Sequence, residues 1–98
     1  MPAYVIVEID VHDTEAYGPY AEGATTSVAA SGGRYLARGG RTESLEGDAP
    51  RPRVVVLTFP DFDAAVAWYH SDAYQAVAPI RHAAAASRMF VVDGVPGG

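Results

Sequence analysis

Cysteine and lysine are both missing from this sequence of 98 residues. Without cysteine the chain can form no disulfide, no thiolate nucleophile and no iron–sulfur cluster. Without lysine it can form no Schiff base, and it lacks the lysine of a phosphate-binding loop. Every side chain with a fixed positive charge is therefore an arginine, a planar fork that binds carboxylate or phosphate through paired hydrogen bonds.

Long apolar runs and blocks of like charge are also lacking. Met1 is followed at once by a predicted strand, with no basic region and no apolar stretch of membrane-spanning length, so we expect a cytoplasmic protein. The formal net charge is −5 and the acids are spread along the chain, which argues against nucleic acid and membrane partners. This length predicts a single domain over residues 1–98, with a flexible tail from about residue 94.

Patterns of apolar residues predict the order strand, helix, strand, strand, helix, strand. The strands are expected over residues 3–9, 33–38, 53–59 and 88–92, with a bulge at Gly39-Gly40. Asp13 and Asp61 are suitable caps for the two helical regions; Pro19 and Pro79 should disturb them. This order predicts the α+β class: a ferredoxin-like four-stranded antiparallel sheet with two helices on one face.

The two faces of the predicted sheet differ in character. The fully apolar rows of the first and third strands, such as Val5, Val7 and Leu57, are expected beneath the helices. The opposite face would then carry Tyr4, Ile6, Glu8, Arg34, Leu36, Arg38, Val54, Val56 and Thr58. A patch with so much aliphatic surface seldom stays bare on a monomer, so we expect a homodimer formed through this face. For the last strand, either Phe90 and Val92 or Met89 and Val91 could meet the helices.

Residue groups along nearly the whole chain carry a family resemblance. They include Gly32 to Gly40, Leu45-Glu46-Gly47, Ala67-Trp68-Tyr69, Ser71 to Gln75, Arg81 and Ser87-Arg88. With these groups the sequence resembles the domain-of-unknown-function family 1330. The resemblance implies a dimeric α+β barrel, a fold shared with small monooxygenases, isomerases and haem-degrading enzymes, and it implies no established activity.

The first candidate site lies on the uncovered sheet face, where Arg34, Arg38, Glu8 and Tyr4 are expected together. Two guanidinium groups against one carboxylate leave a surplus positive charge that suits a small anion such as a carboxylate or enolate. The same side chains could instead form an ion-pair network that only fixes the dimer register. Both interpretations stay open at this stage.

Aromatic residues and histidines form a second set of candidates. Trp68 and Tyr74 could stack on a planar ligand, although aromatic residues at helical spacing more often pack in a core. His82 could act as a general base if it faces a cavity, and otherwise it is a solvated residue near a helix end. The three histidines have no metal-ligand spacing, so we expect no metal site.

Two functions follow from these candidates. In the first, a homodimer binds a small anionic or aromatic metabolite between sheet and helices, through Arg34, Arg38, Tyr4, Glu8, Trp68 and Tyr74. Glu8, His82 and Tyr4 are then the candidates for acid–base or cofactor-free oxygen chemistry, and the sequence leaves open whether the protein is an enzyme. In the second, the chain is a non-catalytic binding or assembly module whose arginine–carboxylate pairs stabilise the dimer. No cofactor is expected in either case.

Overall fold

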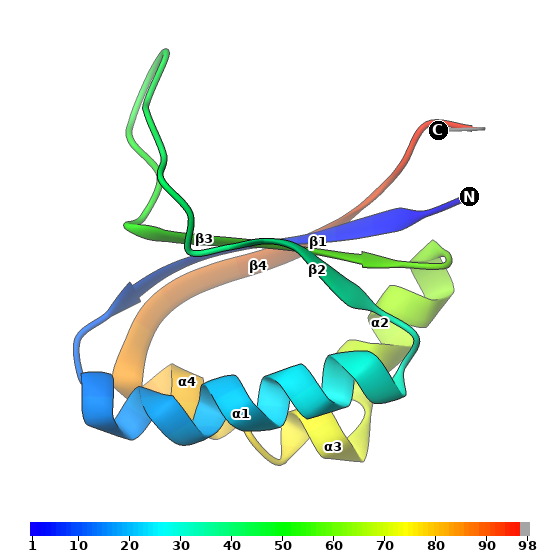
Figure 1. The fold of residues 1–98 in the computed structure, drawn as a ribbon, viewed down its shortest axis with the longest axis horizontal. Helices are drawn as coiled ribbons and strands as arrows, with labels where there is room; N and C mark the ends of the chain where they lie inside the picture. Colours follow the sequence, from blue (N-terminus) through cyan, green and yellow to red (C-terminus); the bar gives the residue numbers. More distant parts are fainter. Residues whose placement is uncertain (97–98) are drawn as a thin grey trace.

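The computed structural model describes residues 1–96, which form one four-stranded antiparallel sheet with helices on one face (Figure 1). The elements are β1 (Ala3–Val11), α1 (Thr14–Ala30), β2 (Arg34–Arg38), β3 (Arg53–Phe59), α2 (Phe62–His70), α3 (Asp72–Gln75), α4 (Ala78–Ala84) and β4 (Ala85–Asp93). The strand order is β2-β3-β1-β4. The predicted ferredoxin-like α+β fold is confirmed, and the second helical region is divided into three short helices, α2 to α4.

The core lies between the sheet and the helices, as the apolar rows predict. In β1 and β3 every second side chain is buried, and Val5 lies opposite Leu57 while Val7 lies opposite Val55. Each fully buried side chain of this size contributes about 1.5–3 kcal/mol relative to an exposed one. The helices complete the core with Trp68 and other aromatic side chains.

The helix α1 begins at the cap that the sequence predicts. Asp13 caps it, because its carboxylate accepts a hydrogen bond from the Ala16 amide at 3.1 Å. Gly32 follows the helix with a φ of 80°, the left-handed conformation that favours glycine at a helix end. Pro19 lies inside the helix without delaying its start at Thr14.

The chain after α2 is divided by its own caps. Ser71 ends α2 and also caps α3, since its hydroxyl accepts from the Tyr74 amide at 3.2 Å. Pro79 lies in the first turn of α4, where a missing amide hydrogen is tolerated. The last strand, expected from residue 88, begins earlier, because β4 starts at Ala85 opposite Val11 of β1. Strand pairing there outweighs the helix preference of alanine.

A register shift in β2 changes the faces of its side chains. Arg34 lies opposite Thr58 and Tyr35 opposite Leu57, but Ala37 then lies opposite Val56, so Leu36 is the extra residue. The irregularity is therefore at Leu36 and not at Gly39-Gly40. Because one extra residue inverts the alternation, Arg38 turns to the helix side, where its Nη2 donates to Thr25 Oγ1 of α1 at 2.8 Å.

The face of the sheet opposite the helices, called the open face below, is uncovered in this chain. The segment 39–52 between β2 and β3 projects from this side of the sheet as an exposed arm (Figure 1). The pairing of β4 with β1 places Met89 and Val91 towards the helices and Phe90 and Val92 on the open face, 47% and 43% exposed. This settles the alternative that the sequence left open.

The two ends of the described chain lie close together, since the Gly94 amide donates to the Pro2 carbonyl at 2.7 Å. The tail predicted from about residue 94 extends to residues 97–98, which lie outside the described residues. No helix within residues 1–96 has the length and apolar character needed to cross a membrane.

Candidate functional site

An open cavity of about 550 Å³ lies between the helix side of β4 and the helices α2 and α4. We call it the outer cleft. Its lining includes Trp68, Tyr69, His70, Arg81, His82 and Met89. A space of this volume can hold a small organic molecule, and its walls combine aromatic surface with a few polar groups, as ligand sites usually do.

The buried charge at the outer cleft is that of Arg81, which is only 4% exposed, whereas Arg88, which also borders the cleft, is 65% exposed and pairs with Glu8. Arg81 donates from Nε to the Tyr74 hydroxyl at 3.3 Å, from Nη1 to the Ser87 hydroxyl, and from Nη2 to His82 Nε2 at 3.3 Å. A guanidinium is only a donor, so His82 Nε2 must accept this bond. No Asp or Glu within residues 1–96 forms an ion pair with Arg81. The positive charge is therefore buried without a counter-charge, which is costly unless an anion joins it.

Tyr74 and Tyr20 continue this network into the core. Their hydroxyl oxygens are 2.8 Å apart, and Tyr74 is fully buried. Tyr74 accepts from Arg81, so its own hydrogen is satisfied only if it donates to Tyr20. Burial, reinforced by Tyr74, raises the pKa of Tyr20 far above its ordinary value, so this hydroxyl stays protonated. Burial opposes the charge of Arg81, but Tyr74 and Tyr20 outweigh it and hold its pKa above the ordinary value.

The aromatic candidates divide between the cleft and the core. Trp68 is 2% exposed, borders the outer cleft and donates from Nε1 to Ser27 Oγ at 3.0 Å. Tyr74 has no exposed surface, and its hydroxyl holds Arg81 in place. His82 lies in the cleft beside Arg81. Of the candidates for proton transfer, Glu8, Tyr4 and His82, only His82 borders the outer cleft.

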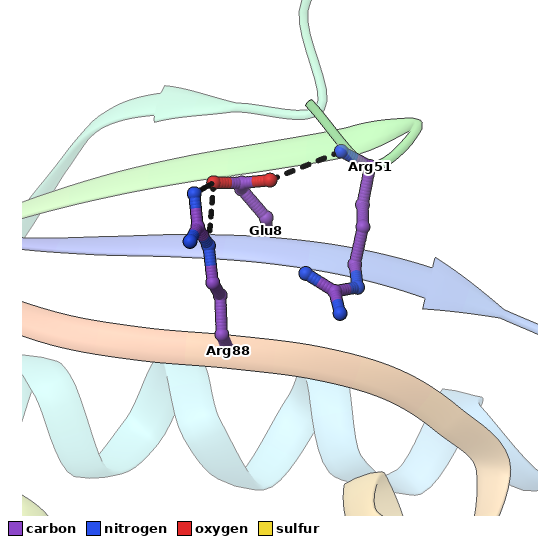
Figure 2. Close-up of polar contacts among 3 residues, drawn as sticks. All are labelled: Glu8, Arg51 and Arg88. Carbon is purple, nitrogen blue, oxygen red and sulfur yellow. Dashed lines mark hydrogen bonds and ion pairs between the residues drawn. The ribbon is translucent and has the colours of Figure 1, made fainter. Parts of the chain in front are cut away.

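Glu8 lies on the open face and is held by the Arg88 side chain and the Arg51 backbone amide (Figure 2). Arg88 donates to Glu8 Oε2 from Nε at 2.9 Å and from Nη2 at 2.6 Å, and the Arg51 amide donates to Oε1 at 3.1 Å. The Arg88 hydrogen bonds, followed by the Arg51 amide, lower the pKa of Glu8. Only one guanidinium, that of Arg88, pairs with Glu8, because Arg51 contributes its backbone amide; the two guanidinium groups expected around this carboxylate are not present in this chain.

The cluster of Tyr4, Glu8, Arg34 and Arg38 predicted from the sequence does not form. Arg38 is on the opposite side of the sheet, because of the register shift at Leu36. Arg34 lies in the row of Thr58 and Tyr4, four positions along β1 from Glu8, which is about 13 Å. The prediction that one face holds all four is wrong for Arg38, and Arg34 is not a partner of Glu8.

Sequence reasoning missed Arg81 as a site residue although a signal was present. Arg81 follows Tyr74 and Val77 at helical spacing, so a charged residue occupied a position in an otherwise buried stripe. A charge in such a stripe indicates a partner or a ligand. Within residues 1–96, no group of three or more histidine, aspartate or glutamate side chains is placed to hold a metal ion.

Solved structures with the same fold support the architectural class. A protein of unknown function from Rhodopseudomonas palustris superposes with a TM-score of 0.77 at 18% identity, covering 96% of this chain and 82% of that one. SnoaB, a cofactor-independent oxygenase from Streptomyces nogalater, gives 0.68 at 15% identity, covering 96% and 93%. A dimeric ferredoxin-like protein of unknown function from Bacteroides fragilis gives 0.55 at 11% identity, covering 95% and 96%. The fold is that of the dimeric α+β barrel proteins.

Residues 2–95 match the model of the Domain of unknown function DUF1330, so the chain belongs to this family. No curated protein matches the sequence. At identities below one fifth, the solved structures establish the shared fold and leave the chemistry to the residues of this chain.

Proposed function

We propose that this protein binds a small planar organic anion in the outer cleft, with Arg81 as the anchor for its carboxylate or enolate group. The observation that carries this proposal is the buried Arg81 guanidinium, which borders the cleft and has no acidic partner within residues 1–96. A guanidinium in a low-dielectric cleft binds an oxyanion more strongly than the same group in water.

The walls of the cleft favour a flat ligand. Trp68 and Tyr69 border it on the helix side, and Met89 borders it on the sheet side. Aromatic faces and a polarisable thioether pack well against an aromatic or conjugated molecule. An aromatic or enolic carboxylate therefore matches both the charge and the shape of the cleft.

His82 supplies a route from binding to acid–base chemistry. Its Nε2 accepts from Arg81, which leaves the ring hydrogen on Nδ1 in the neutral form. An imidazole beside a bound anion can donate a proton to that ligand or accept one from it. SnoaB, which has the same fold, is a cofactor-independent oxygenase. A reaction of a bound ligand with oxygen is therefore included in the chemistry that we propose for this chain.

The direct test is a titration of benzoate and 1-hydroxy-2-naphthoate, followed by calorimetry and thermal unfolding, with benzamide as the uncharged analogue. We expect the carboxylates to bind and benzamide to bind at least tenfold more weakly. Arg81→Lys keeps the charge but loses the fork, so it should weaken carboxylate binding; Arg41→Lys, on the exposed arm, is the matched control. Equal affinity of wild type and Arg81→Lys, or no binding across a broad panel of carboxylates, would contradict the proposal and favour the non-catalytic module.

The same proposal includes a homodimer formed through the open face. Half-buried Ile6, Val54 and Val56 lie on the same face as the exposed Phe90 and Val92, and together they make a continuous apolar surface, of the kind that marks an interface. A second copy of the chain covers such a face symmetrically. The Bacteroides fragilis protein of the same fold is described as dimeric, which supports this arrangement.

Sedimentation tests the assembly independently of the ligand. Wild type should sediment as a dimer at micromolar concentration, and Phe90→Asp should shift it to a monomer by placing a charge in the apolar face. Phe62→Asp, which changes an exposed phenylalanine on the helix side, is the control and should remain dimeric. A wild-type monomer, or a dimer that tolerates Phe90→Asp, would contradict the proposed interface.

A further inference from the structure

A second, smaller cavity lies on the other side of Trp68, between α1 and the strands β2 and β3. We call it the inner cavity. Its free volume is about 30 Å³, enough for one or two water-sized groups. Tyr17, Tyr20, Tyr35, Arg38 and Arg53 supply its polar and aromatic lining. Trp68 and Met89 border both cavities, so they form the wall between the inner cavity and the outer cleft.

Arg53 supplies the first donor of the inner cavity. Its Nε is buried and has no hydrogen-bond partner in the described part of the chain. The position of the guanidinium depends on Gly39, because a Cβ on that residue would lie 2.5 Å from Arg53 Nη1. Gly39 also has a φ of 69°, which only glycine adopts easily. The arm therefore begins with a residue that leaves room for this guanidinium.

Tyr20 supplies the second donor. Either hydroxyl of the Tyr20–Tyr74 pair could be the donor in their bond, so one of the two hydrogens is left over. Because Tyr74 has no exposed surface and Tyr20 borders the inner cavity, we assign the remaining hydrogen to Tyr20. The Tyr20 hydroxyl forms no second hydrogen bond among residues 1–96, and the inner cavity is the space that it borders. A buried donor without an acceptor is rare in folded proteins, and two around one cavity indicate that the cavity holds an acceptor.

The charge around the inner cavity points to an anion. Arg38 borders it from the outer side, stacked 4.4 Å above the Tyr35 ring and bonded to Thr25. Glu22 shares an outer groove with Arg38 but forms no ion pair with it. Two guanidinium groups thus border a small cavity, and among residues 1–96 no carboxylate neutralises either of them.

We propose that the inner cavity is a binding site for a compact anion, of the size of chloride or formate, which accepts from Arg53 Nε and the Tyr20 hydroxyl. The volume excludes a hydrated oxyanion as large as sulfate, and the two guanidinium groups that border the cavity disfavour a cation. The site is separate from the outer cleft and does not depend on the function proposed for it.

Thermal unfolding in chloride tests this site. At fixed ionic strength, replacing gluconate, which is too large for the cavity, by chloride should raise the Tm of wild type by several degrees and reach saturation. Arg53→Met should abolish this chloride-specific rise, while Arg41→Met, an equal loss of charge on the exposed arm, should retain it. An equal rise in wild type and Arg53→Met, or no chloride-specific rise in wild type, would overturn the proposal.

A crystal of wild type grown in bromide gives a second measurement that needs no variant. We expect an anomalous difference peak within 3.5 Å of Arg53 Nε, about the length of a hydrogen bond to a halide. Bromide peaks found only at exposed arginines would overturn the proposal. This result holds even if Arg53→Met fails to fold.

Discussion

Trp68 donates its indole hydrogen to the hydroxyl of Ser27 at 3.0 Å, and both residues are almost completely buried. Ser27 in turn donates to the Ala24 carbonyl at 2.8 Å, one turn earlier in α1. The pair fixes α2 against α1 and sets the orientation of the indole that separates the two cavities.

Replacing Ser27 by alanine should destabilise the protein by about 1–3 kcal/mol, because the buried indole N–H loses its acceptor. For a domain of this size, this corresponds to a fall in Tm of about 4–8 °C for each kcal/mol. Thermal unfolding measures the change, with Thr26→Ala on the exposed side of α1 as the control. Equal Tm values for the two variants would show that the bond contributes nothing.

Gly33→Ala should destabilise the protein more than Gly40→Ala. A Cβ on Gly33 would lie 2.5 Å from the ring of buried Phe59, whereas a Cβ on Gly40 would meet no atom within 4 Å. Overpacking of this kind typically destabilises by about 1–3 kcal/mol. Urea unfolding of the two variants measures the difference. Unfolding of Gly33→Ala at the same urea concentration as wild type would show that Phe59 moves aside without cost.

The ion pair of Glu8 and Arg88 predicts a dependence of stability on pH. The pKa of Glu8 in the folded protein lies below its ordinary value of 4.5, so the carboxylate stabilises the fold above that pH. The contribution is lost as the pH falls through the lowered pKa. The stability difference between wild type and Glu8→Gln should therefore be largest near neutral pH and should vanish in acid.

The Glu8 effect should be small, because Arg88 is 65% exposed and water screens the pair. Unfolding in urea from pH 3 to pH 7 measures it, with Glu43→Gln on the exposed arm as the charge-matched control. High salt should reduce the difference. A gap between wild type and Glu8→Gln that persists unchanged at pH 3 would rule out this origin.

Tyr20→Phe should destabilise the protein by about 1–3 kcal/mol, because it removes the acceptor for the hydrogen of fully buried Tyr74. Tyr17→Phe, on the same helix and only half-buried, should have a smaller effect. Chemical unfolding measures both variants. If Tyr20→Phe is as stable as wild type, Tyr74 does not donate to Tyr20.

The fold could be predicted because its central strands obey simple alternation. In β1 and β3 the residues expected beneath the helices, such as Val5 and Leu57, are the buried ones. The caps Asp13 and Asp61 also act as predicted, because a short acidic side chain before a helix can accept a hydrogen bond from a free backbone amide of the first turn. Strand alternation and helix caps both depend on residues that are close together in the sequence, so the sequence alone is enough to predict them.

The site could not be predicted, because it depends on register and on contacts between distant segments. One extra residue at Leu36 sends Arg38 to the helix side, and nothing in the sequence around it marks this position more strongly than the glycines that follow. The partner of Glu8 is Arg88, 80 positions away in the chain, and only the pairing of β1 with β4 brings them together. Arg81 was visible as a charge in a buried stripe, but its burial became evident only in the structure.

The wall between the two cavities has a practical consequence. Trp68 is the only tryptophan in the sequence, and it borders both spaces. Its fluorescence is therefore a built-in optical reporter that needs no label. Binding in the outer cleft or in the inner cavity should alter the emission of this one indole. Substitution of a residue that lines only one of the two would show which of them the ligand occupies.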